Sequence, residues 1–119
     1  MGAETISPVR NAASTRYAVG VEYDGSRFHG WQSQSGVSTV QDWVEEALAR
    51  VASETIQVVT AGRTDTGVHA TGQVAHFDSS AERSPLNWLR GANTHLPTGL
   101  ALMWVKAVDP GFHARFAAL

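Results

Sequence analysis

The chain of 119 residues contains no cysteine, so a disulfide framework and a thiolate metal site are both excluded. No apolar run approaches the roughly 20 residues that a membrane-spanning helix needs, and residues 1–15 lack the apolar stretch of a secretory signal. A basic excess is also missing, because nine Lys and Arg stand against eleven Asp and Glu. These absences favour a cytoplasmic globular protein and lean against a strongly basic nucleic-acid module.

Arginine carries almost all of the basic charge, since Lys106 is the single lysine among the nine basic residues. A planar guanidinium binds phosphate through two parallel N–H groups and also stacks on bases. A few well-placed arginines can therefore bind RNA without a basic total. The length is that of one domain with a single, modest hydrophobic core.

Hydrophobic periodicity predicts six elements in the order β-α-β-β-α-β. Strands are expected at 17–22, 72–78 and 100–108, where residues alternate with a period of two, and at 56–60, which is a short β-branched run. A helix is expected at 39–51, where apolar residues recur every three or four positions. A second helix is expected at 84–93 from its start signal, although Gly91 weakens it. This order predicts an α+β fold, a ferredoxin-like βαββαβ two-layer sandwich with both helices on one sheet face.

Local signals predict the helix starts and the core. Ser38 and Gln41 form a capping-box pattern for the first helix, and Ser84-Pro85 is a helix start for the second.

The last strand has apolar residues on both faces, which usually means that the sheet has a second partner beyond its helices. Three tryptophans are expected in the core: Trp43, Trp88 and Trp104.

The densest group of chemically active residues is the segment 61–70, with the sequence AGRTDTGVHA. Two glycines bracket the carboxylate of Asp65 and the guanidinium of Arg63, and that positive charge would favour the ionised carboxylate. An ionised carboxylate in a cleft can act as a nucleophile or a base. The alternative is a surface turn, which spacing alone favours slightly, because Asp and Gly are common in turns for local reasons.

Other candidates have equally ordinary alternatives. Trp31 lies in a long loop, 24–38, and could stack on RNA bases, or it could be one buried aromatic that anchors the loop. Arg115 follows the last strand and could meet phosphate, or it could lie in a solvated linker. No metal site is expected. His76 and Asp78 share a strand face, but His69 lies in a loop and no fourth ligand is obvious.

Several segments together resemble the tRNA pseudouridine synthase A family, in chain order over residues 16–119. Gly62-Arg63-Thr64-Asp65 followed by Gly67-Val68-His69-Ala70 is similar to the signature of that family, although Thr66 stands where the family usually has alanine. The other matching segments are Tyr23-Asp24-Gly25 with Phe28, Gly30-Trp31-Gln32 and Gln34; Thr39-Val40-Gln41; Gly72-Gln73-Val74-Ala75-His76-Phe77; and Phe112-His113-Ala114-Arg115-Phe116.

The resemblance implies an isomerase that converts uridine to pseudouridine in the anticodon stem-loop of tRNA, at positions 38–40, with no cofactor and no metal. It implies that Asp65 is the catalytic nucleophile or base. It implies that Arg63 pairs with Asp65 and helps to displace the target base from its stack. The RNA contacts that it implies come from Arg27, His29, Trp31, Gln32, Gln34, His69 and Arg115.

The resemblance also implies a longer protein, because family members continue into a tyrosine element and a second, similar half. The expected organisation is a flexible leader at 1–15, a ferredoxin-like catalytic-aspartate domain at 16–109, and at 110–119 the start of a linker to a missing C-terminal half. The expected partners are tRNA, that half on the open sheet face and a second copy in a full-length homodimer, with no membrane. Because the active site of the family lies between the halves, this portion alone is expected to be inactive.

Two other interpretations stay open. One is a non-catalytic RNA-binding fragment with the same ferredoxin-like fold. The other is a small-molecule-binding regulatory module, for which the sequence offers no ligand pattern.

Overall fold

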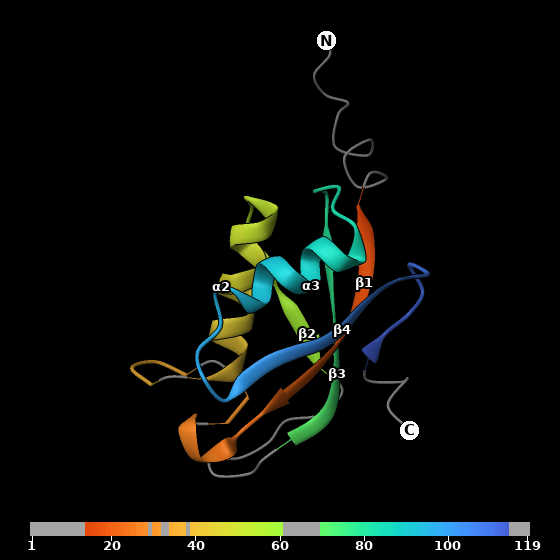
Figure 1. The fold of residues 1–119 in the computed structure, drawn as a ribbon. Helices are drawn as coiled ribbons and strands as arrows, with labels where there is room; N and C mark the ends of the chain where they lie inside the picture. The colour runs from red at the N-terminus through yellow and green to blue at the C-terminus, as the bar shows by residue number, and fades with distance from the viewer. Residues whose placement is uncertain (1–13, 29, 32–33, 38, 61–69, 115–119) are drawn as a thin grey trace.

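The computed structural model describes residues 14–28, 30–31, 34–37, 39–60 and 70–114. It contains four strands, two helices and one 3₁₀ turn (Figure 1). Their bounds are β1 Thr15–Tyr23, the turn Gly25–Arg27, α2 Val40–Ala52, β2 Val58–Thr60, β3 Ala70–Ser79, α3 Pro85–Asn93 and β4 Leu100–Val108.

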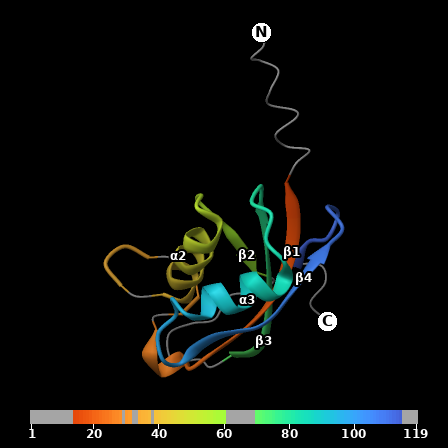
Figure 2. The same ribbon diagram turned by 45° about the horizontal axis from the view of Figure 1, so that its top comes forward.

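The strands form one sheet in the order β2-β3-β1-β4, and every neighbouring pair is antiparallel. Both helices pack against the same face of this sheet (Figure 1, Figure 2). The predicted α+β class and the predicted order of the six main elements are therefore confirmed. In the part of the chain that the structure describes, no helix is long and apolar enough to cross a membrane.

The core lies between the helices and the sheet, and β1 runs through its middle. Tyr17, Val19 and Val21 face the helices and are buried, as the alternation in the sequence predicts. Tyr17 stacks on Phe77 of β3 with ring centroids 5.3 Å apart, and both rings contact Trp88 of α3. Burying one such side chain stabilises a fold by about 1.5–3 kcal/mol, so this aromatic cluster is a main link between sheet and helix.

One of the two predicted helix starts is confirmed and the other is wrong. Ser84 caps α3 as predicted, since its side chain accepts a hydrogen bond from a backbone N–H in the first turn. The capping box predicted from Ser38 and Gln41 is wrong, because the N-cap residue of α2 is Thr39. Its hydroxyl accepts from the N–H of Asp42 at 3.4 Å, which moves the helix start to Val40.

A β-bulge at Met103 decides which way β4 presents its side chains. Leu102 is paired with Val21, but Trp104 is paired with Gly20, so one residue of β4 is skipped. An extra residue in one strand moves the following side chains to the opposite face. Leu102 therefore faces the helices, whereas Trp104 lies on the other face and is 38% exposed.

Of the three tryptophans predicted to be core residues, only Trp88 is fully buried. The prediction is wrong for Trp104, because the bulge directs it away from the helices. It is also wrong for Trp43, which is 37% exposed on the outer side of α2 beside His95.

The sheet face opposite the helices is partly covered by the chain itself. Residues 109–114, called the exit segment below, follow β4 and turn back over this face. A hollow of about 480 Å³ remains beside them. It is lined by residues that include Ala18, Val74, Trp104, Lys106, Val108 and Phe112.

The fit of Trp104 against β1 gives a first test. A Cβ at Gly20 would overlap the indole, so Gly20→Ala should lower the free energy of unfolding by about 1–3 kcal/mol, as overpacking does. Urea unfolding measures this loss. In a Trp104→Ala background the same substitution should cost much less.

Gly111→Ala is the matched control, because no atom beyond the neighbouring residues of the chain lies within 4 Å of a Cβ there. It should change stability by no more than about 0.5 kcal/mol. Equal losses for Gly20→Ala with and without the indole would show that Trp104 does not pack on Gly20.

Candidate active site and RNA interface

One end of the sheet gathers the segments that carry the sequence motifs. Tyr23, the last residue of β1, is paired with Ala70 at the start of β3 and with Leu100 at the start of β4. β2 is antiparallel to β3, so the chain of β2 runs toward the same end of the sheet and leaves the strand after Thr60. The loop after β1 and the segment between β2 and β3 are therefore attached at neighbouring points.

Several predicted site residues lie outside the described residues. In the segment 61–69 these are Asp65, Arg63 and His69; in the loop after β1 they are His29 and Gln32; and after the exit segment it is Arg115. The described candidates are Arg27, Trp31 and Gln34.

Arg27 is held at the surface by the turn that follows β1. Asp24 begins this turn, where its carboxylate accepts from the N–H and hydroxyl of Ser26 at 2.9 and 2.6 Å. The Arg27 guanidinium lies 3.5 Å from the Asp24 carboxylate. Its side chain is 54% exposed, so it is open to an anion approaching from solvent.

Gly99 explains why Arg27 lies where it does. Its carbonyl accepts from the N–H of Asp24 at 2.8 Å, which joins the turn to the start of β4. Gly99 has a φ of +91°, a value that L side chains rarely adopt. A Cβ there would overlap the Arg27 side chain, so the missing side chain leaves room for the arginine.

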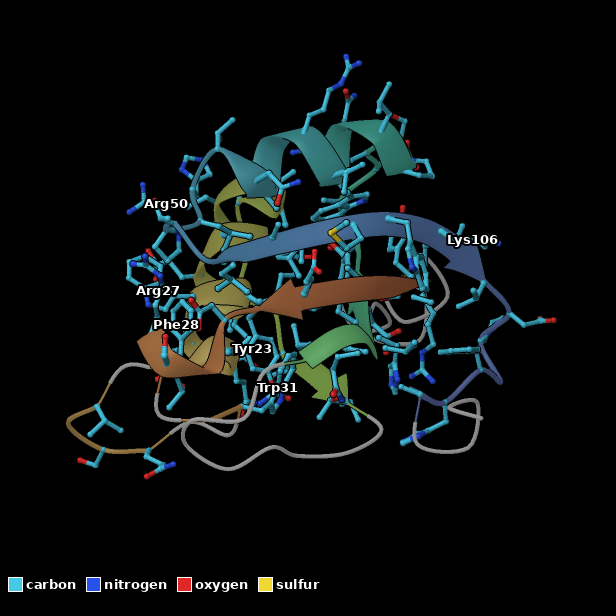
Figure 3. The ribbon with its side chains drawn as sticks, turned by 60° about the horizontal axis from the view of Figure 1, so that its bottom comes forward. Tyr23, Arg27, Phe28, Trp31, Arg50 and Lys106 are labelled. Atoms are coloured by element: carbon cyan, nitrogen blue, oxygen red, sulfur yellow. The ribbon has the colours of Figure 1, made fainter. Side chains whose placement is uncertain are left out.

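Trp31 lies in the interior, with only 2% of its surface exposed. Its ring is tilted against that of Tyr23, and both lie with Phe28 at the end of β1 (Figure 3). The carbonyls of Gly30 and Trp31 accept from the first two amides of α2, those of Val40 and Gln41, at 3.1 and 2.9 Å. Such amides have no partner within their own helix. This burial fits the alternative of a loop anchored by one aromatic, and it leaves little of the indole to stack on RNA.

Gln34, in contrast, is exposed where the same loop passes through solvent. The loop thus combines a buried anchor with polar side chains at its surface. Such a division is typical of binding loops, which are positioned by a rigid scaffold.

A network that the sequence reasoning missed joins β1, β3 and the exit segment. Arg16 donates two hydrogen bonds to the Asp78 carboxylate, at 2.7 and 2.9 Å, and a third to the carbonyl of Phe112 at 2.5 Å. His76 accepts the N–H of Ala114 on its Nδ1 atom at 3.1 Å. A possible signal was the alternation that puts His76 and Asp78 on one strand face, but their partners are far away in the sequence.

The charges in this network shift its pKa values. The hydrogen bond from Arg16 is the main reason why the pKa of Asp78 is lowered. Burial, and after it the positive charge of Arg16, lowers the pKa of His76. His76 is therefore neutral near pH 7, and because Nδ1 accepts a hydrogen bond, its proton is on Nε2.

Within the described residues, no three His, Asp or Glu side chains are grouped so that they could hold a metal ion. The ionisable groups described so far form hydrogen bonds and ion pairs instead.

The described part of the chain is thus an α+β domain whose loop after β1 carries an exposed arginine, Arg27, and an exposed amide, Gln34. A family model described as tRNA pseudouridine synthase matches residues 19–117. A tRNA pseudouridine synthase A from Photorhabdus laumondii is 58% identical over 103 residues, which are 87% of this chain and 39% of the relative. Proteins of the same name from Pseudoalteromonas atlantica and Neisseria gonorrhoeae are 59% and 56% identical, over 87% and 90% of this chain.

The chain therefore belongs to the tRNA pseudouridine synthase family. It spans 39–41% of the length of these three relatives.

The role of Trp31 can be tested through stability. Trp31→Ala should lower the free energy of unfolding by about 3–5 kcal/mol, the usual cost of removing a buried aromatic. Trp43→Ala, at an exposed position on the outer side of α2, should cost far less. Urea unfolding of both variants measures the difference.

Trp31→Phe separates anchoring from direct contact with RNA, because it keeps an aromatic ring in the core. If Trp31 acts only by anchoring the loop, any RNA affinity that the parent chain shows should be the same in this variant. Lost affinity with unchanged stability would instead assign the indole to the RNA contact.

Proposed function

We propose that this chain supplies the catalytic aspartate of a tRNA pseudouridine synthase, which isomerises uridine to pseudouridine. The observation that carries the proposal is the family match, which covers residues 19–117 and therefore includes the segment 61–70 that contains Asp65. The substrate that we propose is the anticodon stem-loop of tRNA at positions 38–40. The working enzyme would be a cytoplasmic homodimer that also contains a C-terminal half.

We propose further that the fold is ferredoxin-like, over a domain at 16–109. The element order β-α-β-β-α-β, the strand order β2-β3-β1-β4 and the placement of both helices on one face support this topology. The proposed organisation also has a leader at 1–15, whose last residue already belongs to β1, and a linker at 110–119, whose first five residues lie on the sheet face opposite the helices.

The chemistry requires one glycosidic bond to break and one carbon–carbon bond to form. The bond from C1′ of the ribose to N1 of uracil is lost, the base turns, and C1′ becomes bonded to C5. The proton on C5 leaves and N1 gains a proton, so atoms and charge balance. Asp65 can begin this sequence as an ionised carboxylate, either by attack at C1′, by addition at C6 of the base or by proton abstraction from the sugar.

Arg63 has two tasks in this proposal. Its charge, two residues from Asp65, favours the ionised carboxylate. Its planar guanidinium can replace stacking contacts of the displaced base, whose unstacking otherwise costs a few kcal/mol.

The RNA backbone would be met by further side chains of the proposed site. Arg27 is the described member with the clearest support, because Asp24 and Gly99 hold it while its guanidinium stays exposed. Gln34 is exposed on the same loop. The proposed set also contains His29, Gln32, His69 and Arg115, with Trp31 acting mainly by anchoring the loop.

The proposal is tested with tRNA that carries tritium at C5 of uracil, since forming pseudouridine releases that label. A chimera in which this chain replaces the matching part of the Photorhabdus laumondii relative supplies the remaining length. Asp65→Asn should lower tritium release by roughly 10²–10⁴-fold or more, because the acid–base or nucleophilic group is lost, and should leave tRNA affinity largely intact.

The unsubstituted chimera and the 119-residue chain are the two controls. Release by the Asp65→Asn chimera would remove Asp65 from its role. RNA binding without release by the unsubstituted chimera would favour the alternative, a non-catalytic RNA-binding fragment.

Arg63→Ala in the same chimera should lower the maximal rate of tritium release strongly, because nothing then fills the stack that the base vacates. The rate with saturating tRNA is the quantity to compare. An unchanged rate would mean that another group performs the displacement.

A further inference from the structure

The bulge in β4 places two large side chains on the open sheet face, opposite the helices. Trp104 is paired with Gly20 and Lys106 with Ala18, so both side chains belong to the same face of the strand. Together with Phe112 of the exit segment they border the hollow of about 480 Å³. The remaining lining residues are alanine and valine side chains of β1, β3 and β4. A volume of this order is typical of small-ligand sites.

The indole of Trp104 is held against the sheet. A Cβ at Gly20 would overlap the ring, so the ring lies directly on the backbone of β1. The residue is nevertheless 38% exposed. A ring that is already fixed loses little rotamer freedom when a ligand packs on it, which lowers the cost of binding.

The hollow carries an uncompensated positive charge. Among the described residues that line it, the charged one is Lys106, which is exposed. None of the ion pairs between described residues includes this lysine. Arg16 lies on the same sheet face, but its charge is already matched by Asp78 at 2.7 Å. The hollow therefore suits a ligand with a negative charge.

A flat apolar part and a negative group are the two features that a nucleotide combines. Unpaired bases stack on aromatic side chains, and cationic side chains follow the phosphates of the same strand. An apolar protein segment could also cover the valine and alanine side chains. It would bring no negative charge to the ammonium of Lys106, whereas a nucleotide brings one.

We propose that the hollow between Trp104 and Phe112 is an RNA-binding site in which one unpaired nucleotide stacks its base on the Trp104 indole and places a phosphate against Lys106. The inference rests on the proposed function, because it takes RNA as the substrate. The site binds and orients RNA, and its side chains take no part in the making or breaking of bonds.

This site is separate from the end of the sheet that gathers the sequence motifs. Trp104 lies four residues along β4 from Leu100, which is roughly 13 Å at the rise of an extended strand. In Figure 3, Lys106 and Arg27 lie at opposite ends of the molecule. An RNA strand that reaches both ends would thus be held at two separate places.

Two variants of Trp104 test the stacking contact. The probe is a short, dye-labelled, single-stranded oligouridylate, and fluorescence anisotropy with the 119-residue chain measures its affinity. Trp104→Leu should weaken binding at least about fivefold, as the loss of one base–aromatic stack does. Trp104→Phe keeps an aromatic ring and should retain most of the affinity.

Trp43→Leu is the matched control for these variants. Trp43 is 37% exposed, almost the same fraction as Trp104, but it lies on the outer side of α2. Its replacement should leave RNA affinity unchanged within about twofold. An equal loss for both tryptophans would assign the effect to nonspecific contact with exposed aromatic rings and overturn the proposal.

The salt dependence of binding tests the phosphate contact. For single strands, the slope of log affinity against log salt concentration falls by about 0.7 for each phosphate contact that is lost. Lys106→Gln should reduce the slope by this amount, and Lys106→Arg should keep it. Trp104→Leu should weaken binding without changing the slope, because it removes no charge.

Arg90→Gln is the matched control for the charge, since Arg90 is exposed on α3, on the helix side of the sheet. It should leave the salt slope unchanged. Because Lys106 is exposed, Lys106→Gln should also unfold at the same urea concentration as the parent. A reduced slope in this variant then reports the lost contact and not a damaged fold.

The remaining outcomes decide the proposal. Equal affinity of the parent and Trp104→Leu, an unchanged slope in Lys106→Gln, or no binding by the parent would overturn it. Uridine 5′-monophosphate should compete weakly, and binding as tight as that of the RNA would assign the hollow to a free nucleotide instead. None of these measurements needs turnover, so tritium release by the Asp65→Asn chimera would reject the catalytic role and leave this RNA site standing.

Discussion

The antiparallel pairing of β1 with a strand on each side is the constraint on which the other features depend. Because β1 lies between β3 and β4, its alternation imposes one division on the whole sheet. Its large side chains, such as Val19 and Val21, define the helix side. Its small ones, Ala18 and Gly20, make the other face shallow enough for Trp104 and the exit segment to lie close to the backbone. The same pairing also fixes the point at which the loop after β1 leaves the sheet.

Much of this fold could be predicted because local rules and long-range packing agree. The bounds of β4 match the sequence prediction, and α3 begins and ends within one residue of it. The failures come from contacts that a local pattern cannot express. Loop carbonyls reach the first amides of α2, and its cap falls on Thr39 rather than Ser38. The bulge at Met103 breaks a period of two that a strand pattern assumes, and so Trp104 changes faces.

The candidate site, too, could be predicted from the sequence only in part. Asp65 and Arg63 could be singled out because they are neighbours within one motif, and the resemblance then suggested their roles. The burial of Trp31 could not be predicted from the sequence of its loop, because it depends on contacts with Tyr23 and with the start of α2. The Arg16–Asp78 pair joins residues 62 positions apart and becomes visible only when the strand register is known.

The bulge has a further consequence for how the molecule behaves in a crowded solution. β4 lies at an edge of the described sheet, where unpaired N–H and C=O groups invite another chain to add a strand and start aggregation. An extra residue in such an edge interrupts the regular spacing of those groups and increases the local twist. The charge of Lys106 on the same strand opposes the approach of a second apolar strand. The bulge that directs Trp104 away from the helices thus also shortens the length of edge strand along which two copies of the chain could associate.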